Sequence, residues 1–145
     1  MEMAEWKGHA FGGVDGQNIP LSCLAEPSEG YFEDISSASL AATCKLLGMD
    51  FSNLVFGHNA LDHDCVIVEK EPKTGNIGIV YFEAAGFVPR SWIRTQFKVD
   101  AGSYQCFPND RRNWPVEILD ELEANGFDEV SKVYWKWRHD TKIMR

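Results

Sequence analysis

The sequence has few basic residues and no long apolar run. Of its 145 residues, 14 are Lys or Arg and 22 are Asp or Glu, so the formal net charge is −8. This balance argues against a nucleic-acid partner, whose phosphates attract a basic surface, and against an anionic membrane surface. No apolar run approaches the roughly 18 residues that a membrane helix needs. The opening residues, MEMAEWKGHAFGG, lack the pattern of a secretory signal. We therefore expect a cytoplasmic protein with neither kind of partner.

The cysteines form no metal-binding or redox pattern. Cys23, Cys44, Cys65 and Cys106 are widely spaced, and no CxxC pair exists. In a reducing cytosol, such cysteines are expected to be free thiols.

One loop carries a dense group of potential metal ligands, namely His58, Asp62, His63 and Asp64. The spacing HxxxDHD could bring three ligands together. The alternative is that His58 hydrogen-bonds the backbone while the aspartates are solvated. We favour the alternative and predict no metal. His58 is also a candidate acid or base, because imidazole titrates near neutrality.

The rest of the pattern predicts one α+β domain over residues 1–145, mostly helical with one small hairpin. Hydrophobic residues make up 44% and charged residues 25%, which is typical of a globular chain with one core. Caps, turn residues and apolar periodicity predict individual elements. These are a helix from Ser36 or Ser37 to about Leu47, extended pieces at Ile19–Cys23 and Asn53–Phe56, a hairpin of Cys65–Glu69 and Asn76–Phe82, and helices from Pro89 to about Val99, from Asn113 to Gly126 and from Phe127 to about His139.

The stretch Leu54–Arg94 carries a more specific pattern. Its runs HNALDHDCVIV, EPKTG and GIVYFEAAGFVP resemble the catalytic segment of fungal aminoglycoside-phosphotransferase-like proteins. That family has a loop H-[GN]-D-L-x-x-x-N-[IV], a hairpin turn and a strand G-[IV]-I-D-W-E-x-A-G-x-x-P. Upstream, FGGVDGQNIPL resembles the family's Gly-Gly segment. The resemblance implies a kinase-like C-lobe from which the N-lobe is absent.

Three positions that carry the family's chemistry differ here. Ala60 replaces the Asp that accepts the substrate proton, and Cys65 and Tyr81 replace the Asn and Asp that hold magnesium. Phosphoryl transfer depends on positioning and on metal electrostatics, and a neutral Cys or Tyr is a poor ligand for a hard cation. The residues before His58 also contain no Gly-rich phosphate loop and no VAIK-like lysine. We therefore expect no phosphorylation and no cofactor.

The main hypothesis is a cofactor-free enzyme of fungal secondary metabolism. In this hypothesis, an apolar pocket folds a small lipophilic substrate and assists a cyclisation or isomerisation, such as a pericyclic reaction of Diels–Alder type. His58, Tyr81 and Glu83 are the predicted catalytic residues, as hydrogen-bond donors or as a proton acceptor. The predicted substrate-binding residues are Phe82, Phe87, Trp92 and Arg94.

Each of these assignments has a structural alternative. Tyr81 could fill the space left by magnesium, the other aromatic residues could belong to the core, and Arg94 could lie on the surface. The second hypothesis is a catalytically dead pseudokinase remnant that binds a protein partner, and the third is a decayed gene product. A partner-binding protein would expose a large apolar patch, whereas an enzyme would enclose an apolar pocket. A homodimer would be one way to cover the surface left by the missing N-lobe.

Overall fold

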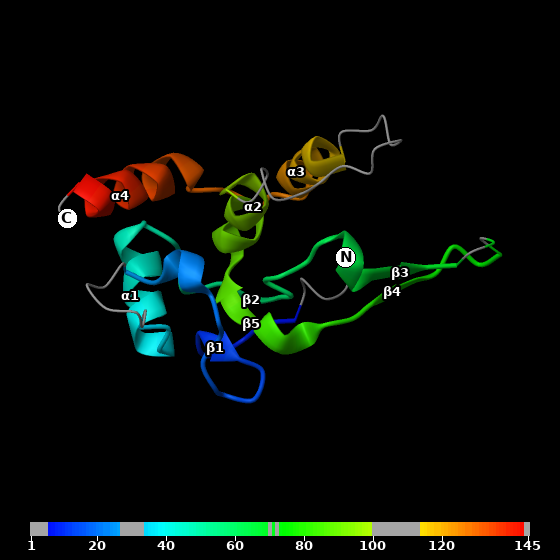
Figure 1. Ribbon diagram of the computed structural model, residues 1–145, viewed down its shortest axis with the longest axis horizontal. Helices are drawn as coiled ribbons and strands as arrows, with labels where there is room; N and C mark the ends of the chain where they lie inside the picture. The colour runs from blue at the N-terminus through cyan, green and yellow to red at the C-terminus, as the bar shows by residue number, and fades with distance from the viewer. Residues whose placement is uncertain (1–5, 27–33, 70, 72, 100–113, 144–145) are drawn as a thin grey trace.

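The computed structural model describes residues 6–26, 34–69, 71, 73–99 and 114–143. Within these residues, four α-helices accompany a three-stranded antiparallel sheet, and a two-stranded hairpin extends away from them (Figure 1). The chain therefore has the α+β class that the sequence predicts. None of the described helices is long and apolar enough to span a bilayer. Cys106 and Asn113, both used in the sequence predictions, lie outside the described residues.

Helix α1 (Ser37–Leu46) forms where the sequence predicts it. The side chain of Ser36 accepts a hydrogen bond from the backbone N–H of Ser39 at 3.3 Å and so caps the helix. The helix ends before Gly48, whose φ of 79° is a left-handed conformation that glycine adopts without strain. The buried side of the helix carries Leu40 and Cys44.

The three-stranded sheet was not predicted as a whole. Strand β5 (Gly86–Pro89) lies in its middle and pairs antiparallel with β2 (Leu54–Gly57), which matches the predicted extended piece. The other edge of β5 pairs with β1 (Gly12–Gly13), where the sequence predicts no strand. The extended piece expected at Ile19–Cys23 is wrong, because the 3-10 turn η2 (Ser22–Leu24) occupies its end.

The predicted hairpin is present and consists of β3 (Val66–Val68) and β4 (Ile77–Ile79). Its second strand is shorter than expected, because the chain turns after Val80 into the 3-10 helix η4 (Phe82–Ala84). The sequence also predicts that helices pack on this hairpin. That prediction is wrong, because the side chains along it are largely exposed and the hairpin extends away from the helices (Figure 1).

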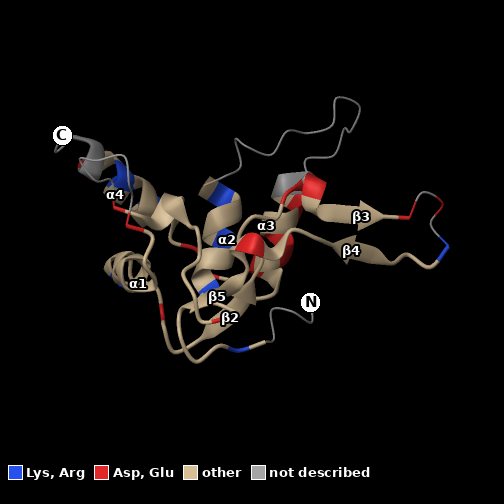
Figure 2. Cartoon of the chain, turned by 60° about the horizontal axis from the view of Figure 1, so that its bottom comes forward, with Lys and Arg blue, Asp and Glu red and all other residues tan. Residues whose placement is uncertain are grey.

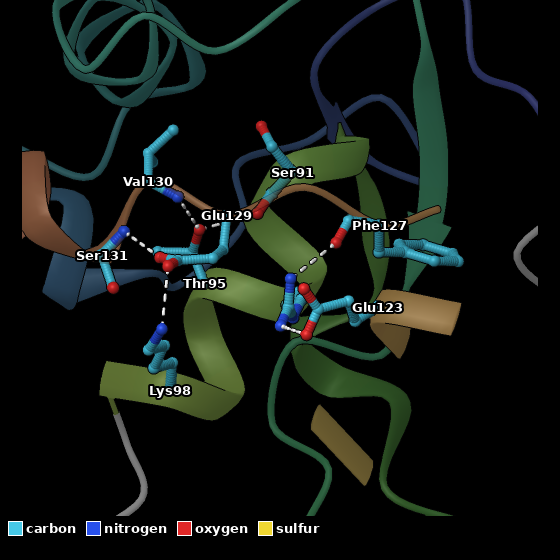
Figure 3. A network of polar contacts seen from close by, with 9 residues as sticks. Ser91, Thr95, Lys98, Glu123, Phe127, Glu129, Val130 and Ser131 are labelled. Carbon is cyan, nitrogen blue, oxygen red and sulfur yellow. Dashed lines mark hydrogen bonds and ion pairs between the residues drawn. The ribbon is translucent and has the colours of Figure 1, made fainter. Parts of the chain in front are cut away.

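The last three helices are α2 (Arg90–Val99), α3 (Trp114–Ala124) and α4 (Ser131–Ile143). Helix α4 begins four residues later than predicted, because contacts with α2 and a local cap hold the chain just before it. The backbone N–H of Val130 donates to the Thr95 hydroxyl at 2.9 Å. The Glu129 carboxylate accepts from the Ser131 N–H at 2.5 Å and from Lys98 Nζ at 2.8 Å (Figure 3).

The core lies between α1, α2, α4 and the sheet. The Tyr134 hydroxyl donates to the carbonyl of Cys23 at 3.1 Å, which ties α4 to the N-terminal segment. The largest buried members of this core include Ile19, Leu24, Leu40, Val88, Trp92, Tyr134 and Trp137.

Candidate functional site

The loop after β2 and the end of the hairpin meet at His58. This side chain is 7% exposed, and its Nε2 lies 2.8 Å from the carbonyl oxygen of Val80. Because a carbonyl only accepts hydrogen bonds, Nε2 carries the proton and donates. The buried Nδ1 has no hydrogen-bond partner in the structure described. His58 thus bonds the backbone, as one of the two interpretations predicts, and keeps one buried acceptor free.

Asn59 fixes the same loop from the other side. Its φ of 61° is left-handed, and its side-chain amide donates to the carbonyls of Gly57 at 3.1 Å and Ala84 at 3.0 Å. The backbone carbonyl of Asn59 accepts a hydrogen bond from the side-chain amide of Gln96 on α2 at 2.5 Å. These contacts tie the loop to β2, η4 and α2 at once.

Tyr81 is the residue after Val80, whose carbonyl accepts the hydrogen bond from His58. Its backbone, like that of Asn59, is left-handed, with φ 64° and ψ 61°. A bulky residue rarely adopts this conformation. Its side chain is 60% exposed, and Glu83 is exposed as well. Two of the three predicted catalytic residues therefore lie at the surface, while His58 is buried.

An aromatic cluster adjoins His58. The Phe82 ring centroid lies 4.9 Å from that of His58 and 6.4 Å from that of Phe56. Phe56 also contacts Phe87 edge-on at 6.1 Å and Trp6 at 5.4 Å. The structure thus brings together three of the predicted site residues, His58, Phe82 and Phe87, and it adds Phe56 and Trp6, which sequence reasoning missed.

Trp92 and Arg94 make structural contacts away from the aromatic cluster. Trp92 is 0% exposed and packs in the core against Tyr134, so the core alternative describes it. Arg94 pairs with Glu123 of α3 at 2.5 Å and donates to the carbonyl of Phe127 at 3.4 Å. Both side chains hold helices in place.

Asp62 of the loop caps a turn. The Asp62 carboxylate accepts from the N–H groups of Asp64 at 2.9 Å and Cys65 at 3.2 Å, at the start of the 3-10 helix η3 (His63–Cys65). In the part of the chain that the structure describes, no three His, Cys, Asp or Glu side chains form a group suited to a metal ion.

Cys44 and Cys65 are free thiols, as predicted. Burial raises the pKa of the Cys44 thiol to about 12, and burial also raises the pKa of Cys65. Neither thiol is therefore a ready nucleophile.

One hollow in the described surface lies away from the predicted site. It has a volume of about 110 Å³ and is open and polar. This is smaller than the roughly 300 Å³ at which pockets for drug-sized ligands begin. Its lining residues are Asp50, Asn53, Arg90, Ser91, Gly126 and Asp128.

The hairpin carries three strongly exposed apolar side chains. Ile67, Val68 and Ile77 are 56%, 65% and 65% exposed, respectively. The runs VIV and IGI show no polar alternation, which is typical of a strand buried on both faces. The lack of alternation is visible in the sequence and indicates strands that need a covering partner.

Charge around the hairpin is mostly acidic. Carboxylates flank β3 at both ends, and α3 carries several more (Figure 2).

In comparisons with known proteins, no protein family, no curated sequence and no solved structure matches this chain. The kinase-like resemblance therefore stays a prediction.

Proposed function

We propose that this chain is a non-catalytic domain that binds a protein partner, and that the β3–β4 hairpin is its binding element. The observation that carries the proposal is the exposure of Ile67, Val68 and Ile77 on a projecting hairpin. Fully burying such a side chain contributes roughly 1.5–3 kcal/mol. Val68 and Ile77 lie on the same face of the hairpin, so a partner that covers this face would offset part of the roughly 4–15 kcal/mol that association costs. In this proposal, the domain is the kinase-like C-lobe remnant of the second hypothesis.

The hairpin backbone also favours binding of another strand. The N–H of Val80 donates to the carbonyl of Cys65 at 3.0 Å. Hydrogen-bonded and non-hydrogen-bonded pairs alternate in an antiparallel ladder, so Ile67 and Gly78 form the next hydrogen-bonded pair. The strand residues on either side of this pair direct their N–H and C=O groups outward, to the two edges of the hairpin.

Within β3 and β4, no charged side chain and no proline guards either edge of the hairpin. No other strand of the described chain pairs with β3 or β4. Proteins usually protect an edge with charged residues, proline or a bulge, and the runs VIV and IGI contain no charge and no proline. An edge of this kind accepts an extended segment of a partner, with main-chain bonds giving affinity and alternate side chains giving specificity.

The cyclase hypothesis needs an enclosed apolar pocket. Trp92 is in the core, Arg94 is ion-paired, and Tyr81 and Glu83 face solvent. These positions support the binding proposal better than the cyclase hypothesis, which stays a prediction.

A random peptide library panned on the immobilised chain tests the proposal. We expect enriched peptides in which every second residue is β-branched or aromatic. Their affinity should fall at least about tenfold with Ile77→Lys, because a charge would enter the buried part of the contact. The matched control is Leu46→Lys, since Leu46 is also 65% exposed but lies on α1. Peptides that bind both variants equally, or a library without any enriched peptide, would contradict the proposal.

A further inference from the structure

We infer that the partner is a second copy of this chain, and that β4 pairs antiparallel with β4 of that copy about a two-fold axis at Gly78. This inference rests on the proposed binding role of the hairpin and specifies its partner.

The edge of β4 is self-complementary. Its outward N–H and C=O groups belong to Ile77 and Ile79, on either side of Gly78. A two-fold axis at Gly78 places Ile77 opposite Ile79 of the second copy, and the reverse, as an isologous contact requires. Each of these two pairs exchanges both of its main-chain hydrogen bonds. Gly78 meets its own copy in a non-hydrogen-bonded pair, where the chains approach most closely.

Charge favours β4 over β3 as the pairing edge. Asp62 and Asp64 precede β3, and Glu69 and Glu71 follow it, so antiparallel pairing of β3 with itself would bring acidic ends together. Hydrogen bonds from Thr74 lower the pKa of Glu69, which keeps this carboxylate charged.

The edge of β4 has opposite charges at its two ends. Lys73 precedes β4 and Glu83 follows it, and both are exposed. An antiparallel copy would therefore bring Lys73 of one chain toward Glu83 of the other, an arrangement that opposite charges favour.

Pairing would also extend an apolar face. The register of the hairpin, with Val66 opposite Ile79 and Val68 opposite Ile77, places these four side chains on one face. Residues opposite each other across β4–β4 share that face, so the combined four-stranded sheet carries a continuous β-branched surface. Cross-strand pairs of this kind contribute roughly 0.2–1 kcal/mol each, and sheets of three or more strands are more stable than an isolated hairpin.

The net charge of −8 on each copy opposes association. Salt screens this repulsion, so the dimer should become tighter as ionic strength rises. A basic partner strand would show the opposite salt dependence.

Cysteine cross-linking tests which edge pairs. A Cβ added at Gly78 would lie 3.5 Å from Ile67 Cβ, an ordinary contact, so Gly78→Cys fits the hairpin. In the proposed dimer, the two Cys side chains meet in a non-hydrogen-bonded pair, whose Cα separation of about 4.5 Å is within disulfide range. Ile67→Cys is the matched control, because it occupies the corresponding position of β3.

Under mild oxidation, we expect a disulfide-linked dimer from Gly78→Cys, and far less from Ile67→Cys or from the wild type, which has the same native cysteines. Preferential cross-linking of Ile67→Cys, or equal cross-linking of both variants, would overturn the inference.

Sedimentation velocity over a concentration series provides a second measurement that needs no disulfide. We expect a monomer–dimer equilibrium that Ile77→Lys weakens at least about tenfold and Leu46→Lys leaves unchanged. A chain that stays monomeric while its peptides still discriminate Ile77→Lys would overturn the dimer but leave the binding proposal standing. If Ile77→Lys changes neither the dimerisation constant nor the affinity for the peptides, both the dimer and the binding proposal would be overturned.

Discussion

The His58 ring donates from Nε2 to the carbonyl oxygen of Val80 at 2.8 Å, across 22 residues of chain. This hydrogen bond joins the loop after β2 to the point where β4 leaves the hairpin. The imidazole therefore helps to hold the base of the projecting hairpin to the three-stranded sheet.

His58→Ala should loosen that base. It removes the donor to a part-buried carbonyl and deletes the ring against Phe82, for an expected loss of about 1–3 kcal/mol in the free energy of unfolding. Urea unfolding measures the loss, and hydrogen exchange should show faster exchange at Val80 and Ile67. His9→Ala is the control, because His9 is exposed, and it should change stability by less than about 0.5 kcal/mol. Equal effects of the two substitutions would mean that the hydrogen bond contributes little.

Substitution of glycine by alanine should change the stability of the fold differently at Gly86 and at Gly78. At Gly86, an added Cβ would lie far inside van der Waals contact with the backbone oxygen of Gly12, so Gly86→Ala must push β1 away from β5. We expect a loss of roughly 1–3 kcal/mol or more. At Gly78 the added Cβ meets only Ile67, and Gly78→Ala should be neutral or slightly stabilising. Thermal melts of the two variants measure the difference, and a neutral Gly86→Ala would contradict the observed pairing of β1 with β5.

Helix α1 and the hairpin could be predicted because their signals are local. Ser36 supplies the cap, Gly48 supplies the stop, and β-branched runs flank a Gly-containing turn. The sheet of β1, β5 and β2 could not be predicted, because Gly12–Gly13 has no side-chain pattern and becomes a strand only by pairing with residues far along the chain. Such pairing depends on tertiary context rather than on propensity.

The candidate site was predictable only in part, because residue type does not specify burial. Phe82 and Trp92 are both aromatic and ten residues apart, yet one lies at the surface beside His58 and the other is fully enclosed. The start of α4 was misplaced for a related reason. Phe127 extends the apolar stripe of the helix, whereas contacts of Thr95 and Lys98 on α2 hold the residues before α4 in a non-helical connection.

Trp92→Ala should show that this residue stabilises the core. Because the side chain is fully buried, its removal leaves a cavity, and we expect a loss of about 3–5 kcal/mol. Trp135→Ala is the matched control on α4. That residue is exposed and keeps an edge-on contact with Tyr134, so its loss should be at most about 1.5 kcal/mol. Urea unfolding compares the two, and similar losses would contradict the burial of Trp92.

The connection before α4 should make stability depend on acid. Burial alone would raise the pKa of Glu129, but hydrogen bonds from Lys98 and Ser131 outweigh it and lower the pKa from 4.5 to about 2 (Figure 3). Because the folded-state pKa is depressed, the carboxylate stabilises the fold fully above its unfolded pKa. This contribution disappears as pH falls from 4.5 toward 2.

Glu129→Gln should therefore lower the melting temperature at neutral pH and flatten its decline across this acidic range. Lys98→Met should reproduce part of the effect, because it removes one of the hydrogen bonds that keep Glu129 charged. The control is Glu117→Gln on the exposed side of α3, which should retain the wild-type acid profile. Melting curves collected from neutral pH down to about pH 2 make the comparison. A Glu129→Gln profile that declines in parallel with the wild type would show that this carboxylate does not set the acid sensitivity of the fold.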